Sequence, residues 1–102
     1  MQLKDNTVKV GGTQPEILIA IMVAQEVFRA YDYAFIITSV TDGEHGYNSK
    51  HYDGDAVDIR TRHIKSPEDL SAIVKDIANR LGEEYDVILH STHLHIEYDP
   101  ND

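Results

Sequence analysis

Histidine and carboxylate side chains that could bind a metal occur in two short stretches of the chain. The first, residues 49–58, reads Ser-Lys-His-Tyr-Asp-Gly-Asp-Ala-Val-Asp and contributes His51 and Asp58; the second contributes His93 and His95. Zinc binds imidazole nitrogen and carboxylate oxygen, and a catalytic zinc keeps a fourth position open for water. We therefore interpret His51, Asp58 and His95 as candidate zinc ligands.

His93 is the candidate for proton transfer. It precedes His95 by two residues, so the alternation of a strand would place both rings on one face. Zinc lowers the pKa of water to about 7 and polarises a carbonyl, but peptide hydrolysis also needs a group that protonates the leaving amine. For His90 a supporting role and no role stay equally open, whereas His45 and His63 are more readily explained as structural or surface residues.

Composition limits the classes of protein that the chain can represent. With 102 residues, 41% hydrophobic and 26% charged, it is expected to form one soluble globular domain, residues 1–102, with an arm at 1–12 and a tail at 99–102. The absence of cysteine excludes disulfides and thiolate zinc sites. A net charge of −9 argues against nucleic acid as a partner.

The chain shows no segment that would direct it into a membrane. No apolar run approaches the roughly 20 residues that cross a bilayer, and the N-terminus lacks the apolar region of a signal peptide. We expect a monomer that is made in the cytoplasm, has no membrane partner, and reaches the cell wall only by release or delivery.

Apolar spacing predicts an α+β fold with a small antiparallel sheet and two main helices packed on one side. The second helix starts at Ser66-Pro67 and stops at Gly82. The expected elements are an edge strand or arm within 1–12, a helix from 13–16 to 31–33, strands at 34–40 and 56–60, a helix at 66–81, strands at 85–90 and 94–98, and a tight hairpin at 91–93.

Alternation within two of these strands separates polar from apolar side chains. Asp58 points away from Val57 and Ile59, and His95 points away from Leu94 and Ile96. If the two strands are neighbours, their polar faces converge with the apolar residues packed behind them.

Residues 49–58 fit the S-x-H-x-x-G-x-A-x-D pattern of the M15 zinc peptidases, which cut peptidoglycan stem peptides as D-Ala-D-Ala carboxypeptidases or L-alanyl-D-glutamate endopeptidases. His93-x-His95 resembles the H-x-H element of the wider group that includes lysostaphin-type peptidases and the hedgehog amino-terminal domain. The resemblance spans about residues 34–98. It implies a hedgehog/D,D-peptidase fold, a zinc ion on His51, Asp58 and His95, catalysis by His93, and Ser49 beside the metal or substrate.

The sequence departs from this family at two positions. Many relatives carry an arginine shortly after the strand at 34–40 that holds a substrate carboxylate; residues 40–43 contain none, and Arg60 or Arg62 are the candidates to replace it. Thr92 stands where other members have an acidic base, which leaves His93 to serve.

Three functions follow from these residues. The resemblance favours a zinc-dependent peptidase that acts on peptidoglycan peptides, and the compact chain without signal peptide or cysteines would suit a phage endolysin. The alternative is a catalytically inactive zinc-containing domain with a binding or structural role. A metal-free acidic domain with coincidental histidines is the third interpretation.

Overall fold

A computed structural model describes residues 2–3, 15–41 and 56–99 of the chain. The sheet has the strand order β1-β2-β3-β5-β4, in which β1 runs parallel to β2 and all other neighbours are antiparallel. The expected α+β fold, with four antiparallel strands and two helices, is confirmed. The elements are β1 (Gln2–Leu3), α1 (Pro15–Ala30), β2 (Ile36–Thr41), β3 (Ala56–Arg60), α2 (Pro67–Leu81), β4 (Tyr85–Leu89) and β5 (His93–Tyr98).

The ends of both helices follow from local chemistry. In α2 the Ser66 side chain accepts a hydrogen bond from the Asp69 N–H at 3.2 Å, and Pro67 occupies the first turn. Gly82 ends this helix at φ 86°, a conformation that suits a residue without Cβ. α1 ends at Ala30, slightly before the expected end, and Asp32 adopts φ 66° immediately after it.

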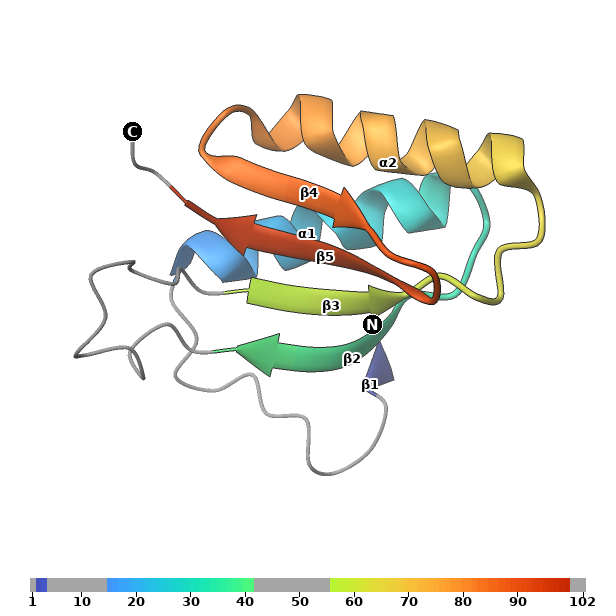
Figure 1. Ribbon diagram of the computed structural model, residues 1–102, viewed down its shortest axis with the longest axis horizontal. Coiled ribbons are helices and arrows are strands. Elements are labelled where there is room, and N and C mark those ends of the chain that lie inside the picture. Colours follow the sequence, from blue (N-terminus) through green and yellow to red (C-terminus); the bar gives the residue numbers. More distant parts are fainter. Residues whose placement is uncertain (1, 4–14, 42–55, 100–102) are drawn as a thin grey trace.

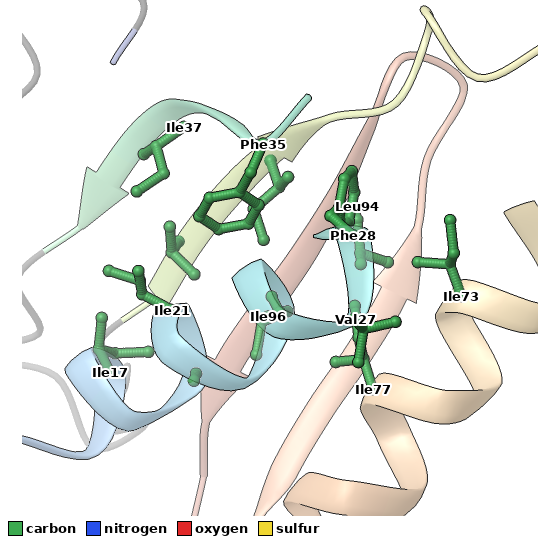
Figure 2. Packing of buried hydrophobic residues seen from close by; sticks show 14 of the residues in the cluster. Ile17, Ile21, Val27, Phe28, Phe35, Ile37, Ile73, Ile77, Leu94 and Ile96 are labelled. Atoms are coloured by element: carbon green, nitrogen blue, oxygen red, sulfur yellow. The ribbon is translucent and has the colours of Figure 1, made fainter. Parts of the chain in front are cut away.

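Both helices pack against one face of the sheet. Figure 1 shows α1 crossing behind the strands, with α2 alongside β4. In Figure 2, Phe28 of α1 lies beside Leu94 of β5, and Ile73 and Ile77 of α2 close the same cluster. All four side chains are fully buried. The opposite face of β3 and β5 carries no described helix, so the polar side chains of these two strands are left accessible there.

The hairpin between β4 and β5 differs from the expectation. The turn was expected at residues 91–93, but His93 is the first residue of β5. Its carbonyl accepts a hydrogen bond from the His90 N–H at 2.9 Å, which closes the hairpin one residue earlier. His93 is thereby held by the ladder, opposite Arg60 of β3.

Small differences also separate the other predicted strands from the structure. β2 covers Ile36–Thr41 rather than 34–40, and β4 ends at Leu89 rather than at residue 90. The register of β2 on β3 shifts between Ile37 and Ser39, which marks an irregularity that alternation alone does not reveal. No described helix is both long and apolar enough to cross a bilayer.

Candidate metal centre

Asp58 and His95 stand opposite each other on the two central strands, β3 and β5. The Asp58 Oδ1 atom lies 2.8 Å from the His95 Nδ1 atom, and both side chains are about one-quarter exposed, at 28% and 25%. Because each strand has a partner on both sides, the backbone under this pair is fixed by ladder hydrogen bonds. The convergence expected from alternation is confirmed for these two residues.

Glu97 contacts the other ring nitrogen of His95. Its Oε1 atom lies 3.2 Å from His95 Nε2. Burial lowers the pKa of His95, but the hydrogen bonds to Asp58 and Glu97, together with the two negative charges, outweigh it and raise the pKa above its usual value. Without a metal, the pair of carboxylates therefore favours a doubly protonated ring.

Glu97 was not among the residues selected from the sequence. The alternation of β5 did place it on the same face as His93 and His95, and that position was the available signal. A carboxylate that accepts from the second nitrogen of a histidine is the usual outer partner of a metal-ligating imidazole. Glu97 is thus a residue of the candidate centre that sequence reasoning missed.

His93 lies on the same face, two register pairs along the strands, opposite Arg60. Its Nε2 atom is 3.9 Å from Asp58 Oδ1, and its Nδ1 atom is 3.4 Å from the Thr92 hydroxyl oxygen. The exposed ring of His90 stacks on His93 with centroids 4.8 Å apart and meets His95 edge to face at 6.1 Å. The structure therefore brings three histidines and one aspartate together on this face.

Arg60 borders this group on the side away from Glu97. It lines a polar pocket of about 300 Å³ together with Thr38, Arg62, Thr92 and His93. The Thr38 hydroxyl donates to the backbone carbonyl of Asp58 at 3.3 Å, which ties β2 to the centre. Arg60, which the sequence offers as a residue that could hold the substrate, therefore lies next to the candidate centre.

Two predicted site residues, His51 and Ser49, lie outside the described residues, as do the signature residues around them and His45. Within the described ranges 2–3, 15–41 and 56–99, no three histidine, aspartate or glutamate side chains form a group that could hold a metal. The expected three-ligand set is thus represented here by two members, Asp58 and His95.

The two described donors fit zinc in chemistry and nearly in spacing. Tetrahedral zinc with bonds near 2.0–2.2 Å holds neighbouring donor atoms about 3.3 Å apart. The 2.8 Å between Asp58 Oδ1 and His95 Nδ1 is a hydrogen-bond distance, so a metal would replace the shared proton while the donors separate by roughly half an ångström. Glu97 is already placed to accept from His95 Nε2 when Nδ1 binds the metal.

His63 lies apart from the centre. Its Nε2 atom is 2.8 Å from the Ala34 carbonyl oxygen, and the ring packs near Phe28 and Tyr33. These contacts give the ring a structural role beside the core, which agrees with the interpretation from the sequence.

No family model, curated protein or solved structure matches this chain.

Proposed function

We propose that this chain is a zinc-dependent peptidase that hydrolyses peptide bonds in peptidoglycan stem peptides and has the fold of the hedgehog/D,D-peptidase group. The observation that carries the proposal is the direct pairing of Asp58 with His95, at 2.8 Å on the open face of the two central strands. These are two of the three positions at which the resembling peptidases hold zinc.

His51, Asp58 and His95 would hold the metal. When bound, zinc supplies a polarised scissile carbonyl and a water of lowered pKa. Asp58 would contribute a carboxylate oxygen and His95 would contribute Nδ1, while its Nε2–H would donate to Glu97, whose Oε1 atom lies 3.2 Å away. This second hydrogen bond fixes the ring orientation and the tautomer that metal binding requires.

His93 would carry the proton between the attacking water and the leaving amine. Its Nε2 atom lies 3.9 Å from the Asp58 carboxylate, so it borders the centre without taking part in the Asp58–His95 contact. The Thr92 hydroxyl at Nδ1 and the stacked ring of His90 restrict its orientation. A positioned imidazole suits both steps of such a transfer, because it can accept a proton and then release it.

The test is mass spectrometry of purified peptidoglycan that has been incubated with the zinc-loaded chain, beside the His93→Ala variant. New stem-peptide fragments with the wild-type chain, strongly reduced with the variant, would support a peptidase and identify the bond. Absence of fragments from every type of wall, with zinc bound, would refute the peptidase and favour the zinc-containing binding domain.

A further inference from the structure

We propose that His90 and His93 form a second, weaker site for a divalent transition-metal ion, distinct from the candidate metal centre. His90 lies directly opposite His93 in the hairpin, because its N–H donates to the His93 carbonyl at 2.9 Å. The two rings stack with their centroids 4.8 Å apart and their planes inclined by 29°. Imidazole nitrogen suits zinc, copper and nickel alike, so two facing rings could share one such ion.

The His90 ring can turn toward an ion. The residue is exposed, and in the part of the chain that the structure describes no hydrogen bond or ion pair holds its ring, which contacts only the rings of His93 and His95. Neighbouring donors on a tetrahedral zinc are about 3.3 Å apart. His90 must therefore leave the stack to bring a nitrogen closer to His93, and exposed side chains change rotamer readily.

His93 has a ring nitrogen that no hydrogen bond occupies. Its Nδ1 atom lies 3.4 Å from the Thr92 hydroxyl oxygen, whereas its Nε2 atom lies 3.9 Å from Asp58 Oδ1, which is beyond hydrogen-bond range. The side chain is 32% exposed, so an ion from solution can reach it. His93 can thus bind an ion through Nε2 while it keeps its contact with Thr92.

The charge around the two rings favours an additional cation. The Asp58 carboxylate approaches His93, and Glu97 lies beyond His95 on the same open face. The zinc proposed at the candidate metal centre would repel a second divalent ion, and these carboxylates together with the net charge of −9 offset part of that repulsion. Because only two side chains would hold the second ion, with water in its other positions, we expect it to bind more weakly than the first.

An ion at this site would inhibit the proposed reaction. It would occupy the nitrogen lone pair with which His93 accepts a proton, so turnover would fall when zinc exceeds one ion per chain. This consequence rests on the proposed peptidase function, whereas the binding of the second ion does not.

The experiment is an NMR titration of the full metal-free chain with zinc, at about pH 8, where most imidazoles are neutral and can bind metal. The signals are the ring C–H groups of the histidines. We expect the first equivalent of zinc to shift the His95 signals, and a separate step at higher zinc to shift those of His90 and His93. Mg²⁺, which prefers oxygen ligands, should shift neither of these two rings. No second step, or equal shifts with Mg²⁺, would overturn the inference.

Variants identify the ligands of the second ion. His90→Gln and His93→Gln should each lose the second step and keep the first, because each removes one of the two nitrogens. His63→Gln removes a histidine that contacts the Ala34 carbonyl, apart from the hairpin, and should keep both steps. A second step that survives in His90→Gln, or is lost in a folded His63→Gln, would overturn the inference. A chain that fills this site while the candidate metal centre stays empty would contradict the proposed function but not this site.

Discussion

At the scale of single residues, the centre is defined by an imidazole between two carboxylates. His95 has Asp58 on one nitrogen at 2.8 Å and Glu97 on the other at 3.2 Å. This arrangement can hold a proton on each nitrogen, or exchange the proton facing Asp58 for a metal ion. Zinc binding at this site would therefore release a proton, and the affinity for zinc would depend on pH.

The replacement of His93 by Gln tests whether this residue transfers protons without binding the metal. We expect the variant to keep its zinc, because His93 is not one of the proposed ligands, and to lose roughly 100- to 10,000-fold in turnover because the proton-transfer group is gone. Zinc content and the rate of stem-peptide cleavage should be measured on the same preparation.

His90→Gln is the matched control for this variant. The two rings stack at 4.8 Å, yet His90 is exposed, and in the described part of the chain no hydrogen bond or ion pair joins it to Asp58. Its replacement should change turnover by only a few-fold. Loss of zinc from His93→Gln, or equal losses of turnover in both variants, would contradict the assigned role.

Residue types and alternation were sufficient to select Asp58, His93 and His95 from the sequence. Alternation also placed Glu97 beside them, but only the distance of 3.2 Å identifies it as the partner of His95. Sequence patterns give the face of a side chain, whereas contacts depend on strand register.

At the scale of elements, the decisive feature is that β3 and β5 are neighbours although α2 and β4 separate them in sequence. The apolar pattern predicted both strands and the face of each residue. The apolar pattern could not show that β3 pairs with β5, because β4, which precedes β5 in the sequence, could have taken the position next to β3. In the observed sheet β5 lies between β3 and β4. Both helices pack on one face of this sheet, so the polar side of β3 and β5 is exposed on the other face.

Leu94 shows how the core supports the centre. It lies between His93 and His95 but points to the opposite face, where it is fully buried against Phe28. Leu94→Ala should lower the free energy of unfolding by about 2–5 kcal/mol, because it leaves a cavity in the core. Denaturant unfolding measures this loss, and Met22→Ala, at a side chain 66% exposed, should stay within about 0.5 kcal/mol of wild type. Similar losses in both variants would contradict the described packing.

The two helices are also joined by a polar contact. The Tyr33 hydroxyl, just after α1, donates to the Asp69 carboxylate in the first turn of α2 at 2.6 Å. This hydrogen bond is the main reason that the pKa of Tyr33 is raised, with burial and the charge of Asp69 adding to it. The folded chain therefore retains this proton more tightly than the unfolded chain.

The sign of the resulting pH dependence follows from that difference. The contribution of Tyr33 to stability is complete below its unfolded pKa of about 10 and is lost as pH rises through the higher folded pKa. The difference in unfolding free energy between wild type and Tyr33→Phe should thus be constant from about pH 7 to 9 and shrink above about pH 10. Denaturant unfolding at a series of pH values measures it, and a difference that grows at high pH would contradict the contact.

At the scale of the whole molecule, the net charge of −9 opposes the approach to a polyanionic cell wall. The Debye length falls from about 30 Å at 0.01 M salt to about 8 Å at 0.15 M. Cleavage of anionic wall preparations should therefore become several-fold faster over this range, while cleavage of a short uncharged peptide should change little. Turbidity loss and peptide release measure the two rates, and a wall rate that falls with added salt would contradict a repulsive long-range field.

The central claim is that Asp58 and His95 hold a zinc ion, and equilibrium dialysis with zinc quantified by mass spectrometry tests it most directly. We predict one zinc per chain at micromolar concentration for wild type and for His90→Gln, and at least roughly tenfold weaker binding for Asp58→Asn and His95→Gln. His51→Gln examines the third proposed ligand in the same way. No zinc on the wild-type chain, or full occupancy in both the Asp58 and His95 variants, would contradict the account.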